Sequence, residues 1–139
     1  MTVSAKHILI EGYTADQILA FTNAELDRFI FVGEPIVFCV GSAEILGQFE
    51  RTKDTLVLEL AQIDRGGEGV LPALGALAAR FAKREGLGFL EWRVHAINCA
   101  KPNLKLRRFL EKRGFEIKQI AKSGECYHRI EALKKLTAY

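Results

Sequence analysis

The architecture is set by residues 55–86, which read TLVLELAQIDRGGEGVLPALGALAARFAKREG. Leucine alternates with other residues over Thr55–Ile63, the period of two that is typical of a β-strand. Asp64–Gly69 then contains three glycines, and Val70–Glu85 behind it carries apolar residues at helical spacing, with Gly86 as the C-terminal cap. The segment therefore predicts a strand, a glycine-rich turn and a helix in direct succession.

A strand that runs through a glycine-rich turn into a helix is a common anion-binding arrangement. Glycines let backbone N–H groups point inward, and the helix N-terminus adds about half a positive charge. The dinucleotide-binding pattern G-x-G-x-x-G is not met, because it needs glycine where Pro72 stands, and no Gly-Lys-Ser/Thr of a P-loop follows. Spacing alone leaves a second interpretation open, in which the glycines only connect the strand to the helix flexibly.

The rest of the chain alternates strands with helices around this segment. A helix is expected after Thr14, with a break around Thr22-Asn23. The other expected elements are strands at Lys6–Glu11, Ile36–Val40, Glu44–Arg51 and Phe89–Ala96, a helix at Asn103–Lys112, and a closing hairpin of Phe115–Ala121 with Cys126–Leu133. This order predicts one domain over residues 1–139, of the α+β or α/β class, with a mixed sheet.

Composition excludes several classes of protein. The 139 residues are 49% hydrophobic and 27% charged, an ordinary globular balance that argues against a disordered or fibrous chain. The apolar runs are too short to span a membrane, and the N-terminus is not expected to be a signal peptide, so we expect a cytoplasmic protein. The three cysteines form no C-x-x-C and the three histidines are scattered, so we expect reduced thiols and no metal site.

The second half of the chain carries a family resemblance. The glycine loop, the helix VLPALGALAARFAKREG, the strand FLEWRVHA and the run NLKLRRFLEKRGFEI follow one another as in the GNAT-type N-acetyltransferases, which this chain resembles. That family has a strand, R/Q-x-x-G-x-G/A, a helix, a strand and N-x-x-A-x-x-L-Y-x-x-x-G-F. Counting back from Gly114-Phe115 places the family asparagine on Asn103. The resemblance implies an acyl-CoA N-acyltransferase-like fold, α/β/α layered, with a mostly antiparallel central sheet and a splayed strand pair.

The resemblance also implies an activity and a set of binding residues. Acetyl-CoA is the implied cosubstrate, and an amine of a small molecule or a protein attacks its thioester directly, with no metal and no covalent enzyme intermediate. Residues from the strand end would line the pantetheine arm, the loop would hold the pyrophosphate, and the asparagine would lie near the cofactor. The implied cofactor-binding residues are Ala61, Gln62, Ile63, Arg65, Gly66, Gly67, Glu68, Gly69, Val70, Leu71 and Asn103.

Four positions depart from the family pattern. The arginine or glutamine of the family falls on Gly66, one residue after Arg65. The second loop glycine falls on Leu71, Glu68 places a carboxylate where phosphates would lie, and the tyrosine that often protonates the departing thiolate falls on Leu110. These residues keep an alternative open, in which the chain is a catalytically degenerate GNAT-fold protein with a binding or regulatory role.

Two residues are the candidate catalytic groups. Glu59 lies on the strand before the loop, opposite Leu58 and Leu60, and would act as base toward the amine; the alternative is a solvent-facing strand residue. Tyr127, on the closing hairpin, would replace the missing acid, or else only packs. His95 is a further candidate base, with a hydrogen-bonded strand residue as its alternative.

The charge pattern bears on partners. Net charge is +3, and a basic run extends from Lys101 to Arg113, interrupted among charged residues only by Glu111. Its members are Lys101, Lys105, Arg107, Arg108, Lys112 and Arg113. A solvated helix face explains this run, and contacts to the coenzyme 3′-phosphate or to RNA are the alternatives. We expect neither membrane nor nucleic acid as the principal partner. A homodimer through Phe29, Phe31 or the closing hairpin stays open.

Overall fold

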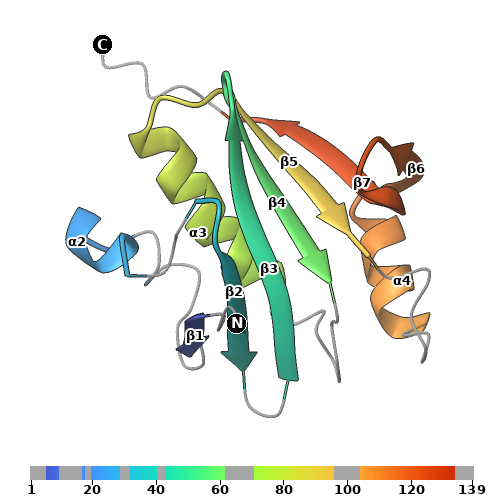
Figure 1. The fold of residues 1–139 in the computed structure, drawn as a ribbon, viewed down its shortest axis with the longest axis horizontal. Coiled ribbons are helices and arrows are strands. Elements are labelled where there is room, and N and C mark those ends of the chain that lie inside the picture. Colours follow the sequence, from blue (N-terminus) through green and yellow to red (C-terminus); the bar gives the residue numbers. More distant parts are fainter. Residues whose placement is uncertain are drawn as a thin grey trace, which may run out of the picture.

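The computed structural model describes residues 6–9, 17, 20–28, 32–40, 43–61, 71–95 and 104–133. Its sheet has seven strands within these ranges, in the order β1-β2-β3-β4-β5-β7-β6 (Figure 1). They are β1 (Lys6–Leu9), β2 (Pro35–Val40), β3 (Ala43–Thr52), β4 (Thr55–Ala61), β5 (Phe89–Val94), β6 (Glu116–Ile120) and β7 (Gly124–Ala132). The helices are α2 (Asn23–Leu26), α3 (Leu71–Arg84) and α4 (Leu104–Lys112).

The sheet is mixed and mostly antiparallel. Only β1 with β2 and β4 with β5 pair in parallel; the other neighbouring strands are antiparallel. The parallel pair β4–β5 is joined through α3, since parallel neighbours need a crossover connection. The predicted α+β class with a mixed sheet is confirmed. From Ile36 onward, the predicted elements agree with the described ones to within a few residues at their ends.

Two glycines end the long helices as the sequence predicts. Gly86 has φ +72°, its N–H donates to the Lys83 carbonyl and the next N–H, of Leu87, donates to the Ala82 carbonyl. This is a Schellman cap, in which a left-handed residue without a Cβ closes the last turn. Gly114 ends α4 in the same way, with φ +84°.

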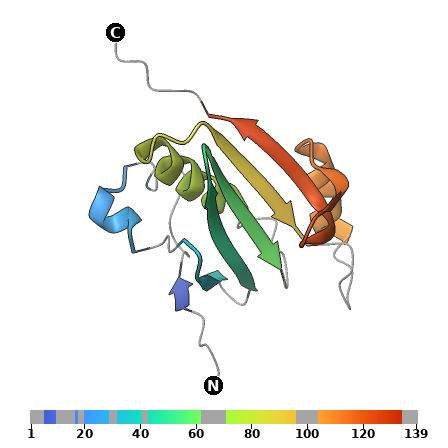
Figure 2. The same cartoon turned by 45° about the horizontal axis from the view of Figure 1, so that its top comes forward.

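The described helices all pack on one face of the sheet. The strand residues that join the core cluster alternate along each strand and share one face, for example Leu58 on β4 and Trp92 on β5. Buried residues of α2, α3 and α4 complete the same cluster. In Figure 2, α4 lies near β6 and β7, at the opposite end of the sheet from β1. The expected α/β/α layering therefore appears within the described ranges as one helical layer on one face.

In the first helical region, the structure describes α2. Thr22 caps α2 through a capping box with Glu25, which confirms a helix start at the expected break, and the residues around Thr14 lie outside the described ranges. Arg84 of α3 pairs with Asp27 at 2.7 Å and donates to the Asn23 carbonyl, which joins α2 to α3.

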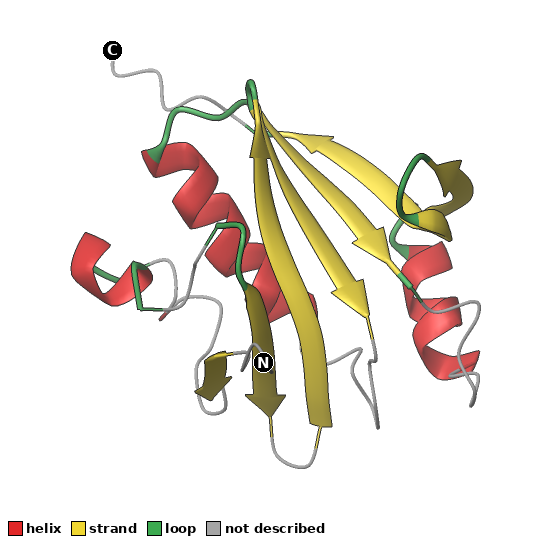
Figure 3. Cartoon of the chain, in the orientation of Figure 1, coloured by secondary structure: helices red, strands yellow, loops and turns green. Residues whose placement is uncertain are grey.

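The opposite face of the sheet carries no described helix (Figure 3). The strands β4 and β5 pair over their described length, from Thr55 with Phe89 to Leu60 with Val94. Beyond the last pair, the His95 N–H donates to the Leu60 carbonyl at 2.9 Å. The expected splay of this pair would begin after that bond, and the residues that follow Ala61 lie outside the described ranges.

Candidate functional site

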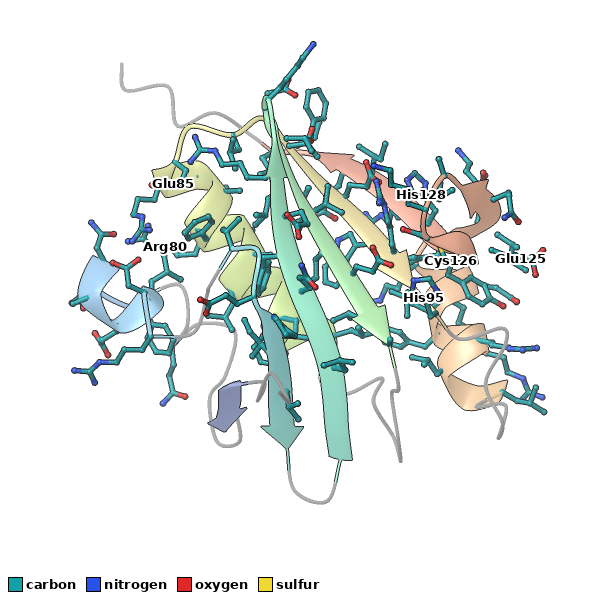
Figure 4. All side chains as sticks on the ribbon, viewed as in Figure 1. Arg80, Glu85, His95, Glu125, Cys126 and His128 are labelled. Carbon is teal, nitrogen blue, oxygen red and sulfur yellow. The ribbon has the colours of Figure 1, made fainter. Side chains whose placement is uncertain are left out.

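A polar cluster lies on the open sheet face, at the carboxyl ends of β4 and β5. The register pairs Glu59 with Arg93 and Arg93 with His128, so these residues from three adjacent strands share one face. Figure 4 places His95, Cys126 and His128 close together, where β5 and β7 run side by side. Ligands of sheets with parallel strands bind preferentially at the carboxyl ends of those strands. This edge of the sheet is therefore the candidate site.

Glu59 is the centre of this cluster. Its Oε2 lies 2.8 Å from Nε2 of His95, and its Oε1 accepts a hydrogen bond from the Ser123 hydroxyl at 3.1 Å. The Arg93 guanidinium is 3.9 Å from Oε1. The Glu59 side chain is 33% exposed and that of His95 is 27% exposed, so both groups are positioned by protein contacts yet reachable from solvent.

A second carboxylate extends the network across β5 and β7. Arg93 donates through Nε to Glu91 at 2.6 Å and through Nη1 to the Ser123 oxygen at 3.2 Å. Nε2 of the buried His128 lies 3.4 Å from Glu91. Each carboxylate thus faces one imidazole, and Arg93 lies between them. This arrangement keeps the Glu59 carboxylate in a defined orientation, which a general base needs.

The thiol of Cys126 lies beside the cluster but is not arranged as a nucleophile. Burial raises the pKa of this thiol, and the negative charge of Glu59 raises it further, while Arg93 opposes the effect. A reactive cysteine needs the opposite shift, toward thiolate. Cys126 is therefore a packing residue on this face.

A cavity of about 260 Å³ opens next to Glu59. Its walls come from β2, β3 and β4, and combine apolar side chains with two carboxylates; they are Pro35, Leu46, Gly47, Gln48, Glu50, Glu59 and Ala61. The Glu50 carboxylate accepts a hydrogen bond from Gln48. A cavity with an apolar wall and carboxylates is chemically suited to an amine that carries a positive charge before it loses its proton.

The structure does not bring the two predicted catalytic residues together. Tyr127 is 2% exposed and belongs to the core cluster on the helical face, whereas Glu59 points to the open face. The Tyr127 hydroxyl donates to Glu111 of α4 at 3.1 Å. Burial, reinforced by this hydrogen bond, raises the pKa of Tyr127.

Four of the predicted site residues are described. Besides Glu59 and Tyr127 these are Ala61, which lines the cavity, and Leu71, which is buried at the start of α3. The other predicted cofactor-binding residues lie outside the described ranges: Gln62, Ile63, Arg65, Gly66, Gly67, Glu68, Gly69, Val70 and Asn103.

Ser123 and Arg93 are members of the cluster that the sequence did not single out. Ser123 lies in the β6–β7 turn, 64 residues from Glu59 along the chain, and no local pattern marks the pairing. Arg93 adjoins Trp92 on β5, and the alternation of that strand predicts only that it faces away from the core.

The described residues include neither a metal-ligand cluster nor a membrane-spanning helix. Among them, no group of three or more His, Cys, Asp or Glu side chains is placed to hold a metal ion. No helix in the described ranges is long and apolar enough to cross a membrane.

Comparisons with known proteins give a likeness to solved structures alone. No protein-family model matches the chain, and no curated protein matches its sequence. A crystal structure of Ard1 from Thermoplasma volcanium aligns with 88% of this chain and 95% of that chain, at 16% sequence identity and a TM-score of 0.47. A likeness at this level identifies neither the activity nor the substrate of this chain.

Proposed function

We propose that this chain is a cytoplasmic, acetyl-CoA-dependent N-acetyltransferase that transfers an acetyl group directly to an amine of a small molecule or a protein. The observation that carries the proposal is the contact of 2.8 Å between Glu59 and His95, at the carboxyl ends of a parallel strand pair. The pair lies beside a cavity and on the face without a described helix. The proposed reaction, acetyl transfer from acetyl-CoA to an amine, comes from the resemblance of the sequence to the GNAT-type N-acetyltransferases.

Glu59 is the proposed general base. An alkylamine is protonated at neutral pH, so a transferase must remove a proton before the nitrogen can attack an acyl carbon. Glu59 reaches both solvent and the cavity, and its two oxygens are held separately by His95 and Ser123. His95 would pass the proton to solvent, because its side chain is also partly exposed.

The cavity is the proposed amine site. Glu50 and Glu59 supply negative charge to attract the ammonium form, and Leu46 and Pro35 supply apolar surface for its carbon skeleton. The amine would thus bind with its nitrogen near the residue that accepts its proton.

Acetyl-CoA is the proposed cosubstrate, and it would supply the acetyl group already activated as a thioester. One described feature supports binding of its phosphates. The helix α3, 14 residues long, begins at Leu71, shortly after the glycine-rich segment that follows β4, and a helix N-terminus attracts anions. We propose that Arg65–Leu71 bind the pyrophosphate, that Ala61–Ile63 line the pantetheine arm and that Asn103 contacts the cofactor.

A second candidate function is a non-catalytic binding protein of the same fold. Leu110, which stands where the family tyrosine is expected, is fully buried in the core and has no proton to give. Tyr127, the candidate replacement, already donates its hydroxyl proton to Glu111. Its role as an acid stays a prediction.

The experiment that tests the proposal is an acceptor screen. The purified protein is incubated with acetyl-CoA and a panel of alkylamines, polyamines, amino acid amides and peptides, and acetylated products are detected by mass spectrometry. We expect at least one primary amine to be acetylated faster than without protein. Binding of acetyl-CoA without product from any member of the panel would favour the second candidate, and absence of both would overturn the two together.

A further inference from the structure

A second cavity lies on the helical face of the sheet, away from Glu59. It has a volume of about 270 Å³ and lies between the first turns of α3, the end of α4 and the strands β5 and β7. An apolar protein cavity of about 150 Å³ is enough to admit benzene. The space here therefore suffices for an aromatic ring with one polar substituent.

Trp92 contributes an unpaired hydrogen-bond donor at this cavity. Its side chain lines the cavity and is 5% exposed, and its Nε1–H has no hydrogen-bond partner among the described residues. The ring atom Cζ2, on the same indole edge as Nε1, is the atom nearest to where a Cβ on Gly75 would lie, at 3.2 Å. Gly75 also lines the cavity, so the benzene ring of the indole borders it. A buried donor of this kind normally has an acceptor.

The remaining walls are aromatic and positively charged. Phe115 packs edge-on against Trp92 with ring centroids 6.0 Å apart, and Phe109 lies under the guanidinium of Arg113 at 4.9 Å. Arg113 makes no ion pair with a carboxylate in the described part of the chain. Arg129 lies 3.4 Å from Glu131, so the charges of these two lining residues offset each other and Arg113 leaves a net positive charge.

We propose that this cavity binds a small aromatic carboxylate. The aromatic walls would hold the ring, the indole N–H of Trp92 would donate to a carboxylate oxygen, and Arg113 would neutralise its charge. Trp92 and Arg93 are neighbours on β5 and face opposite sides of the sheet, so this cavity is separate from the Glu59 cluster. It adjoins the proposed pyrophosphate loop through Leu71, and the proposal needs only binding of the carboxylate, not acetyl transfer. A carboxylate satisfies both the donor and the unpaired cation, which an amine or a hydrocarbon of the same size does not.

The test uses the single tryptophan of the chain. In the full-length, ¹⁵N-labelled protein, the indole N–H gives one resonance in a two-dimensional spectrum, and it reports on Trp92 alone. Benzoate is titrated into the protein, and benzylamine, of similar size and opposite charge, serves as the matched probe. We expect a saturable downfield shift of the indole resonance with benzoate and none with benzylamine.

Three variants make the result specific. Arg113→Gln should weaken benzoate binding about tenfold, as expected for the loss of a hydrogen-bonded charge, and Arg129→Gln tests the second guanidinium separately. Arg108→Gln, on an exposed position of the same helix outside the cavity lining, should bind like wild type. The proposal is overturned if benzoate leaves the indole resonance unmoved, if benzylamine binds equally well, or if Arg113→Gln and Arg108→Gln behave alike in folded protein.

Discussion

Replacing Glu59 by glutamine separates the proposed catalytic role of this residue from a structural one. Glutamine has nearly the same shape, and its oxygen can still accept the hydrogen bond that Ser123 donates to Glu59 at 3.1 Å. What the variant removes is the negative charge facing His95 at 2.8 Å and the ability to take up a proton. Because the side chain is one-third exposed, its ion pairs are expected to contribute no more than about 1 kcal/mol to the free energy of unfolding.

The two expected magnitudes therefore differ greatly. A loss of up to about 1 kcal/mol corresponds to a fall in Tm of about 4 °C or less for a domain of this size. Loss of a general base typically lowers the rate by about 100- to 10,000-fold, or about 3 to 5 kcal/mol of transition-state stabilisation. Glu59→Gln should thus keep its fold and lose most of its acetyl transfer.

The assay follows release of the coenzyme A thiol with a chromogenic reagent, using an amine that the wild-type protein acetylates. Glu50→Gln is the matched control, since Glu50 lines the same cavity but belongs to a separate contact, with Gln48. The control should change KM for the amine more than kcat. Wild-type kcat in Glu59→Gln, or an equal fall of kcat in both variants, would refute the assignment of the base.

Three further predictions concern the described core. Tyr127→Phe should lower the free energy of unfolding by about 1 kcal/mol in urea denaturation, because one hydrogen bond to the exposed Glu111 is lost; wild-type stability would contradict the hydrogen bond. The pKa values of Cys126 and Tyr127 are raised in the folded chain, so the unfolded chain loses these two protons at lower pH than the folded chain does. Their contribution to the free energy of unfolding should therefore be complete below pH 9 and fall as the pH rises above it. A Tm that is constant up to pH 11 would contradict this. Phe49→Ala should cost about 3–5 kcal/mol because Phe49 is fully buried, whereas the same change at Phe89, which is 38% exposed, should cost clearly less; equal losses would contradict the core assignment.

The sequence predicted the elements because their determinants are local. Gly86 and Gly114 are needed at helix ends with positive φ. The order of the elements then implied the mixed sheet. These features depend on residues a few positions apart.

The site could be predicted only in part, because its contacts depend on register. The sequence marked Glu59 as a candidate base but did not predict its contact with His95. That contact follows from the strand register, which pairs Glu59 with Arg93 and brings His95 within 2.8 Å of the Glu59 carboxylate. Ser123 reaches Glu59 from a turn that local patterns mark only as a turn. Tyr127 was a candidate acid or a packing residue, and the alternation of its strand turns its side chain into the core against α4.

The most direct test of the proposed function is isothermal titration calorimetry of the protein with acetyl-CoA. We expect a saturable heat of binding, which is abolished in the variant Gly69→Trp because a bulky side chain would fill the glycine-rich turn that the sequence predicts before α3. The absence of any binding heat at millimolar acetyl-CoA would contradict the proposed transferase, and unchanged affinity in Gly69→Trp would contradict the assignment of the loop.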